Sequence, residues 1–122
     1  MKKKILIVDD ETSILKLLKF SLERAGYEIR TESLGSKTVA ASEEFKPDLI
    51  LLDVNIPDMD GGTILAELGR RIELSTIPVV FLTGAVANDE AETTTIQGRA
   101  VVAKPIRMER LYSTIQKATG GP

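Results

Sequence analysis

The chain has 122 residues with a formal net charge of −2 at pH 7, and 43% of its residues are hydrophobic and 28% are charged. This composition predicts a single globular domain over residues 1–122 and excludes a disordered chain. The near balance of charge offers no basic surface for direct nucleic-acid binding, and no apolar run approaches the roughly 20 residues that span a bilayer. The sequence has no cysteine, which excludes disulfides and favours the cytoplasm, and no histidine, the commonest metal ligand and general base.

The first half of the chain alternates short apolar runs with apolar residues at helical spacing. The predicted elements are a strand over 5–8, a helix with Leu15, Leu18, Leu22 and Ala25 that ends at Gly26, a weaker strand over 27–31, a helix over 39–45 entered near Ser36, and a strand over 49–52 that ends at Asp53.

The second half repeats this alternation. The predicted elements are a helix marked by Ile64, Leu65, Leu68 and Ile72, a strand over 79–82 that ends at Thr83, a poorly anchored helix over 88–98, a strand over 100–103 followed by Lys104 and Pro105, and a helix with Met108, Leu111, Ile115 and Ala118.

The pattern is therefore five repeats of a strand followed by a helix. Because the strands are continuous apolar runs rather than alternating ones, we expect both faces of the sheet to be buried, as in a parallel sheet covered by helices. Right-handed crossovers then favour a doubly wound α/β sandwich.

Polar and charged residues follow the apolar strands. Asp9 and Asp10 follow the first strand, and Asp53, Thr83 and Lys104 end or follow strands three, four and five. Because ligands bind at the carboxyl ends of strands in an open parallel sheet, we expect these side chains to form one site. Three neighbouring carboxylates would raise one another's pKa unless a cation neutralised them, and oxygen ligands without His or Cys suit Mg²⁺.

The expected Mg²⁺ site has four contributions from the chain. Asp10 and Asp53 would be ligands, Asp9 would bind directly or through water, and the backbone carbonyl of Asn55 would complete the set. Mg²⁺ held in so open a site keeps waters that phosphate oxygens can replace.

Asp53 is the expected nucleophile for a phosphoryl group, because a carboxylate can accept one and Asp53 ends the central strand between the acids and Lys104. Phosphoryl transfer depends mainly on positioning and charge neutralisation. We expect Mg²⁺ to contact one phosphoryl oxygen, Lys104 another, and the Thr83 hydroxyl with the Ala85 N–H a third.

Four segments resemble the receiver domain of two-component response regulators: ILIVDDE (5–11), PDLILLDVNIPDMDGG (47–62), IPVVFLTG (77–84) and AVVAKPI (100–106). The resemblance implies a flavodoxin-like (βα)5 sandwich with a five-stranded parallel sheet in the order 2-1-3-4-5. It also implies transfer of phosphate from a sensor kinase phosphohistidine to Asp53.

The resemblance further assigns roles to individual residues. It implies that Asp9 and Asp10 bind Mg²⁺, that Thr83 acts as a switch, and that Lys104 contacts the phosphate and precedes a cis peptide bond to Pro105. The sequence departs from the family where Val101 stands, since the family often has Tyr or Phe three residues before the lysine. The connector between Gly98 and Lys104 is also about one residue shorter than usual.

Each of these residues has a plain structural alternative. Asp10 could cap the first helix, Asp53 could be a turn residue, and Lys104 could be solvated. A Mg²⁺-dependent phosphatase of the haloacid dehalogenase kind is the alternative function, although Asn55 stands where that group has its general acid. A flavodoxin-like FMN carrier fits poorly, because only 4% of the residues are aromatic and acids follow the first strand.

The expected partners follow from the signalling interpretation. A sensor histidine kinase or phosphotransfer protein would donate the phosphoryl group, and a downstream protein or an output domain absent from this sequence would respond. We expect the response, and a homodimer if one forms, at the surface made by residues 88–118, with no role for nucleic acid or membrane.

Overall fold

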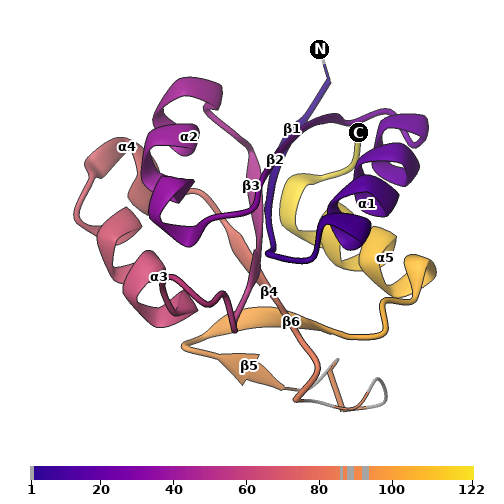
Figure 1. Cartoon of the computed structure of the whole chain (residues 1–122). Coiled ribbons are helices and arrows are strands. Elements are labelled where there is room, and N and C mark those ends of the chain that lie inside the picture. Colours follow the sequence, from indigo (N-terminus) through magenta and orange to yellow (C-terminus); the bar gives the residue numbers. More distant parts are fainter. Residues whose placement is uncertain (1, 86, 88–89, 92–93) are drawn as a thin grey trace.

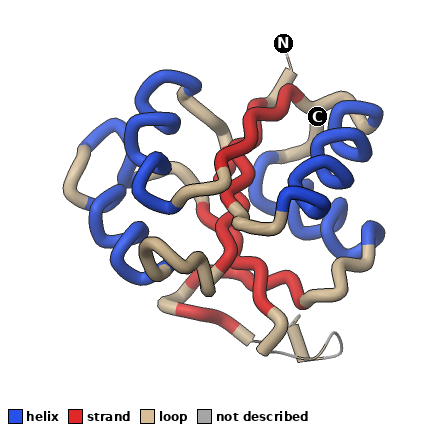
Figure 2. Tube along the Cα trace, viewed as in Figure 1, coloured by secondary structure: helices blue, strands red, loops and turns tan. Residues whose placement is uncertain are grey.

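In the computed structural model, which describes residues 2–85, 87, 90–91 and 94–122, six strands form one sheet. Helices lie on both faces of the sheet (Figures 1 and 2). The elements are β1 (Lys4–Val8), α1 (Thr12–Arg24), β2 (Glu28–Glu32), the 3₁₀ helix η1 (Gly35–Lys37), α2 (Thr38–Phe45), β3 (Leu49–Asp53), α3 (Gly61–Gly69), α4 (Ile72–Ser75), β4 (Val79–Thr83), β5 (Thr95–Ile96), β6 (Arg99–Ala103) and α5 (Met108–Thr119).

The order of the strands confirms the predicted topology. The sheet runs β2-β1-β3-β4-β6-β5, and the first five of these strands pair in parallel, which is the predicted order 2-1-3-4-5. Helices α1 and α5 cover one face of the sheet, and α2, α3 and α4 cover the other (Figure 1). The doubly wound α/β sandwich is confirmed.

Alternate residues of the central strands enter two separate hydrophobic cores. In β3, Leu49 and Leu51 belong to the core beside α1 and α5, whereas Ile50 and Leu52 belong to the core beside α2, α3 and α4. All four side chains are fully buried. A strand buried on both faces has no solvent side to carry polar residues, which explains its continuous apolar sequence.

The predicted helix over 88–98 is only partly visible, because residues 88–89 and 92–93 lie outside the described residues. The described hydrogen bonds include helical-type i to i−4 pairs, in which the N–H groups of Ala91 and Thr94 donate to the carbonyls of Ala87 and Glu90.

The end of that segment contradicts the helix prediction. Thr95 and Ile96 form β5, a sixth strand that pairs antiparallel with β6. Gln97 and Gly98 make the two-residue turn, with φ values of 49° and 77° that suit a tight hairpin. The helical interpretation is wrong here because β-branched residues favour an extended chain and glycine tolerates the turn geometry.

The third predicted helix also ends earlier than expected. Helix α3 stops at Gly69 and the separate one-turn helix α4 begins at Ile72. Ile72 is 89% exposed, so it is not part of the apolar stripe to which its spacing assigned it. The break turns the chain back so that Leu74 packs in the core instead.

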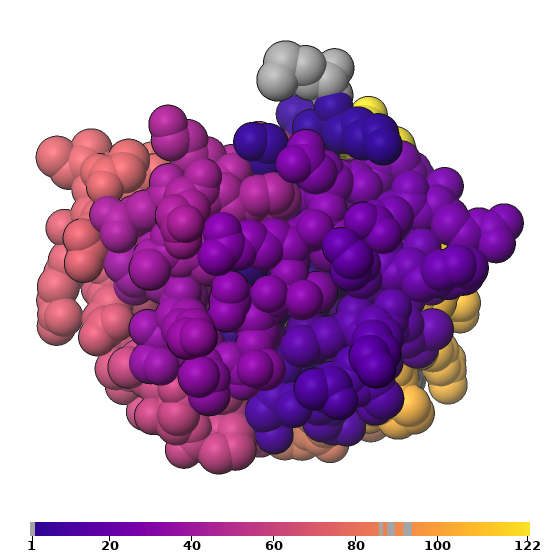
Figure 3. All heavy atoms as spheres, turned by 45° about the horizontal axis from the view of Figure 1, so that its top comes forward, coloured from indigo at the N-terminus to yellow at the C-terminus, as the bar shows by residue number. Residues whose placement is uncertain are grey.

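The start of β1 and the C-terminal end of the chain lie at the same end of the molecule (Figures 1 and 3), and Figure 1 shows that this end is opposite the carboxyl ends of the strands. Among the described residues, none of the helices has the length and apolar character needed to cross a bilayer.

Candidate functional site

The register of the parallel strands brings the predicted site residues together. Val8 lies beside Leu52, so Asp9 and Asp53 follow at the same level, and Thr83 lies beside Ala103, the residue before Lys104. The site is therefore assembled from four strands that are distant in the sequence but adjacent in the sheet.

Lys104 is the centre of the cluster. Its Nζ atom lies 2.9 Å from Asp9 Oδ2, 3.0 Å from Asp53 Oδ2 and 3.2 Å from Glu11 Oε1. Asp9 is fully buried and Asp53 is 5% exposed. We refer to Asp9, Glu11, Asp53 and Lys104 as the Lys104 cluster. Because isolated buried charges are costly, the ammonium is the group that makes these two carboxylates tolerable.

The backbone fixes the second oxygen of each buried carboxylate. The Glu11 N–H donates to Asp9 Oδ1 at 2.9 Å, and the Asn55 N–H donates to Asp53 Oδ1 at 3.1 Å. Both bonds join residue i to residue i+2, so each aspartate orders the loop that follows its own strand. The two Oδ2 atoms are thereby directed toward Lys104.

Burial and pairing shift two pKa values in the cluster. Burial raises the pKa of Asp9, and the hydrogen bond from the Glu11 N–H and the neighbouring Lys104 ammonium only partly oppose this shift. Burial by itself would lower the pKa of Lys104, but its pairing with the Asp9 and Asp53 carboxylates outweighs burial, and the net shift is upward. Lys104 is therefore firmly cationic at neutral pH.

The aspartates also meet the geometric requirement of a metal site. One oxygen from each of Asp9, Asp10 and Asp53 can be chosen so that all three lie within 4.8 Å of one another. Asp9 Oδ2 is buried and, despite its ion pair with Lys104, receives no hydrogen bond of good geometry. Such an oxygen has a lone pair available, and an all-oxygen donor set fits a hard cation such as Mg²⁺.

Thr83 and Ala85 form a contact that differs from their expected role. The Ala85 N–H donates to Thr83 Oγ1 at 3.1 Å, and Thr83 is 1% exposed. In this state the two groups that were expected to share a phosphoryl oxygen bond to each other instead. The main chain links the same strand end to the cluster, because the Lys104 N–H donates to the Thr83 carbonyl at 2.8 Å.

Sequence reasoning missed Glu11. Its carboxylate is the third one in contact with Lys104, although the two residues are 93 positions apart in the sequence. The signal was its place directly after the Asp9–Asp10 pair, but nothing in the spacing indicated that the side chain turns back toward a lysine on another strand.

Val101 lies three residues before Lys104, at the position where the receiver family often has Tyr or Phe. It is 4% exposed, lies beside Phe81 in the sheet register and belongs to the core beside α2, α3 and α4. The predicted cis peptide bond between Lys104 and Pro105 is present.

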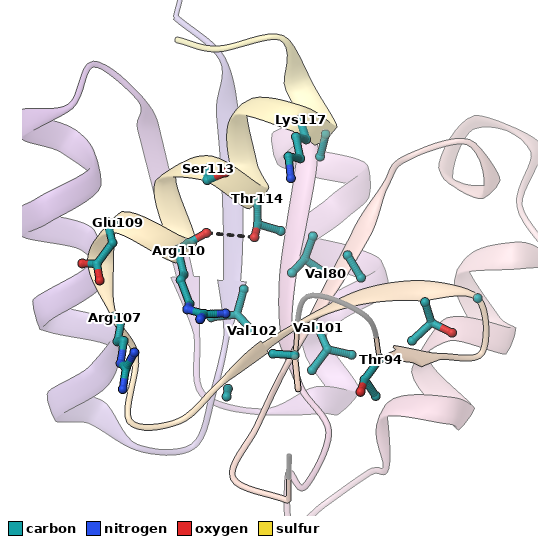
Figure 4. Close-up of a pocket in the computed structure, with 16 residues that line it drawn as sticks. Val80, Thr94, Val101, Val102, Arg107, Glu109, Arg110, Ser113, Thr114 and Lys117 are labelled. Carbon is teal, nitrogen blue, oxygen red and sulfur yellow. Dashed lines mark hydrogen bonds between the residues drawn. The ribbon is translucent and has the colours of Figure 1, made fainter. Parts of the chain in front are cut away.

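A separate groove of about 760 Å³ lies between α5 and β6 (Figure 4). Its cationic side chains are Arg107, Arg110 and Lys117, and Val102 forms part of its apolar floor. None of the described residues that line it belongs to the Lys104 cluster. Nearly all of its lining falls within the 88–118 surface.

Mg²⁺ is expected to stabilise the protein at about pH 7.5 but very little at about pH 4. Since the folded-state pKa of Asp9 is raised, ionised Asp9 opposes folding increasingly as pH rises from 3.8 through its folded value. The ion relieves this cost only when Asp9 is ionised. At a free Mg²⁺ concentration ten times the Kd, the gain is about 1.4 kcal/mol. Thermal melts with Mg²⁺ or EDTA at both pH values measure it, and equal gains at both would contradict the assignment.

Comparison with known proteins is consistent with this geometry. The family model described as "Response regulator receiver domain" matches residues 5–116. The polar-differentiation response regulator DivK of Brucella ovis is 35% identical over 122 residues, covering 98% of each chain. The alkaline phosphatase synthesis transcriptional regulatory protein PhoP of Bacillus subtilis is 46% identical over 90 residues, which are 74% of this chain but only 35% of PhoP.

A solved structure has the same fold. The receiver domain of the sensor histidine kinase PA1611 from Pseudomonas aeruginosa, described with a magnesium ion coordinated in its active site cleft, aligns with a TM-score of 0.85 at 23% identity. The alignment covers 99% of this chain and 100% of that one. At this level of identity the match establishes the fold.

Proposed function

The chain belongs to the response regulator receiver domain family, and from that membership we propose that Asp53 accepts a phosphoryl group and that Thr83 and Lys104 respond to it. The observation that carries the proposal is the position of the Asp53 carboxylate. It lies 3.0 Å from the Lys104 ammonium and within 4.8 Å of oxygens from Asp9 and Asp10. A nucleophilic carboxylate is thus held between a fixed cation and an acidic cluster suited to a second one.

The proposed transfer is a direct displacement at phosphorus. One oxygen of Asp53 attacks phosphorus, the bond from phosphorus to the donor breaks, and the donor leaves with the electron pair and takes a proton from solvent. No general base is needed, since the Asp53 carboxylate is the nucleophile in its ionised form. Lys104 neutralises negative charge on the phosphoryl oxygens, and the buried setting strengthens that interaction.

Asp9, Asp10 and Asp53 would hold Mg²⁺, with the Asn55 carbonyl as a further ligand. When bound, the ion would neutralise phosphoryl charge and align the incoming group. The chain's own contribution is to fix the orientation of Asp9 and Asp53 through hydrogen bonds from the Glu11 and Asn55 N–H groups.

The Thr83 hydroxyl and the Ala85 N–H would change partners on phosphorylation. Their mutual hydrogen bond would be exchanged for bonds to a phosphoryl oxygen, which would draw the loop after β4 toward Asp53. Because β4 pairs with β6, this movement would reach the 88–118 surface, where we propose that a partner or a second copy of the chain binds.

The comparisons give no support to the phosphatase alternative. Asn55 would also have to act as its general acid, and an amide has no proton to transfer at neutral pH. Hydrolysis of p-nitrophenyl phosphate by the purified chain would favour the phosphatase, whereas a single covalent phosphoryl group without turnover favours the receiver.

We propose the following cellular setting. A histidine kinase or phosphotransfer protein in the cytoplasm would phosphorylate residues 1–122, acting as one domain. The chain spans 35% of PhoP but 98% of DivK, so both an attached output domain and action on a separate protein agree with the relatives. The chain would catalyse only its own phosphorylation and dephosphorylation.

Incubation with acetyl phosphate is expected to add one phosphoryl group to the wild-type chain in the presence of Mg²⁺ and none with EDTA. The adduct should be acid-stable and base-labile, as an acyl phosphate is. The Asp53→Asn variant keeps the size of the side chain but lacks the nucleophilic oxygen, so it should stay unmodified. Intact mass spectrometry measures both, and modification of Asp53→Asn at the wild-type rate would remove the assignment.

A further inference from the structure

The Glu11 side chain has no role in the transfer described above, yet it lies 3.2 Å from the ammonium on which that transfer depends. We propose that Glu11 is a positioning residue: it holds Lys104 until a phosphoryl group replaces it, and its charge makes the site discriminate against highly anionic phosphodonors. The proposal rests on the proposed function of Asp53.

Helix capping does not explain this side chain. Glu11 is the N-cap residue of α1, but its side chain makes no capping hydrogen bond. Its backbone carbonyl accepts bonds from the N–H groups of Ile14 and Leu15, which any residue could provide. Ser, Thr, Asp and Asn are the residues that cap well, and Glu is not among them. The carboxylate is directed to Lys104 instead.

The donor capacity of Lys104 makes Glu11 a competitor of the phosphoryl group. An ammonium has three N–H donors, and Lys104 donates to Asp53 Oδ2 at 3.0 Å and to Glu11 Oε1 at 3.2 Å, while Asp9 Oδ2 lies 2.9 Å away as an ion-pair partner. A phosphoryl oxygen that approaches this ammonium therefore competes with carboxylates that already contact it. The Glu11 side chain is 54% exposed, whereas those of Asp9 and Asp53 are at most 7% exposed. Water can solvate Glu11 after release, so it is the least costly partner to lose.

The charge of Glu11 also opposes the approach of anions. With Asp9, Asp10 and Asp53 it gives the site four carboxylates around one lysine. Lys104 and Mg²⁺ together would balance three of those four charges, so the site would keep one net negative charge, which removal of the Glu11 charge would cancel. Coulomb repulsion scales with the charge of the donor and is screened by salt.

The Glu11→Gln variant keeps the side-chain shape and removes the charge. With Mg²⁺, its second-order rate constant for acetyl phosphate, a dianion, is expected to rise about three- to tenfold, and that for the less anionic phosphoramidate less than about twofold. High salt should reduce the difference. In an equilibrium measurement, trifluoroberyllate, which mimics a phosphoryl group on Asp53, should bind Glu11→Gln more tightly by a similar factor.

Two controls separate charge and position from general effects. Glu73→Gln removes the same charge from exposed helix α4, which precedes the amino end of β4, and should leave both rate constants unchanged. Glu11→Asp retains the charge and should keep the wild-type preference between donors to within about twofold. Equal rates for wild type and Glu11→Gln with both donors would overturn the proposal, and so would Glu11→Asp behaving as Glu11→Gln.

The proposed function and the role of Glu11 would be contradicted by different results. If the wild-type chain is not phosphorylated, or Asp53→Asn is, the proposed function fails. If the wild type is phosphorylated on Asp53 but donor preference does not depend on residue 11, only the role of Glu11 fails.

Discussion

Replacing Lys104 with methionine is expected to slow phosphorylation by acetyl phosphate about a hundredfold or more and to lower the free energy of unfolding by about 3 kcal/mol. Methionine keeps the length of the side chain but removes the only cation in contact with Asp9 and Asp53 among the described residues. The loss of stability lies at the lower end of the range for a broken buried ion pair, because Asp9 can take up a proton.

The pH dependence of this effect follows from the direction of the Lys104 shift. Its pKa is raised above the ordinary value of 10.5, so the stability it contributes is fully present below that pH and is lost as pH rises through the folded value. Wild type and Lys104→Met should therefore differ most at neutral pH and converge in strong alkali.

Urea unfolding and phosphorylation kinetics measure both effects. Lys19→Met is the matched control, because Lys19 forms an exposed i,i+4 ion pair with Glu23. It should change the unfolding free energy by less than about 0.5 kcal/mol and leave the phosphorylation rate unchanged. A Lys104→Met protein with wild-type phosphorylation kinetics would show that the ammonium does not contact the transferred group.

Phe81→Ala is expected to lower the free energy of unfolding by about 3–5 kcal/mol, enough to unfold much of a marginally stable domain. Phe81 is 1% exposed in β4 and packs in the core beside α2, α3 and α4. Its ring touches the start of α3 so closely that a Cβ built on Gly61 would lie 3.0 Å from it. The substitution would therefore open a cavity directly behind the strand that carries Thr83.

The same substitution at Phe20 provides the comparison. Phe20 is 61% exposed on α1 and contacts only the Arg24 guanidinium among the ring contacts described. Phe20→Ala should cost less than about 1 kcal/mol. Equilibrium unfolding in urea distinguishes the two, and similar losses at both positions would contradict the core assignment.

Sequence patterns were most informative for the central strands, whose side chains are buried on both faces of the sheet. Continuous apolar runs predicted the buried strands correctly, because a strand covered on both faces cannot carry polar residues. They were least informative after Thr83. There, the sequence suggested a poorly anchored helix over 88–98, but the β-branched pair at 95–96 pairs with β6 through the two-residue turn at 97–98. This choice follows strand propensity, which is a weak and context-dependent signal in so short a segment.

The sequence by itself predicted that one site would gather Asp9, Asp10, Asp53, Thr83 and Lys104, because the ends of parallel strands meet at one edge. The strand order came from the resemblance of its motifs to the receiver family. Only the tertiary structure decided which oxygen faces which donor. It directed Glu11 to Lys104 rather than to the helix it precedes, engaged the Ala85 N–H with Thr83, and left Ile72 in solvent. The physical reason is that hydrogen-bond geometry and burial depend on neighbours brought from other strands, which spacing along one segment does not encode.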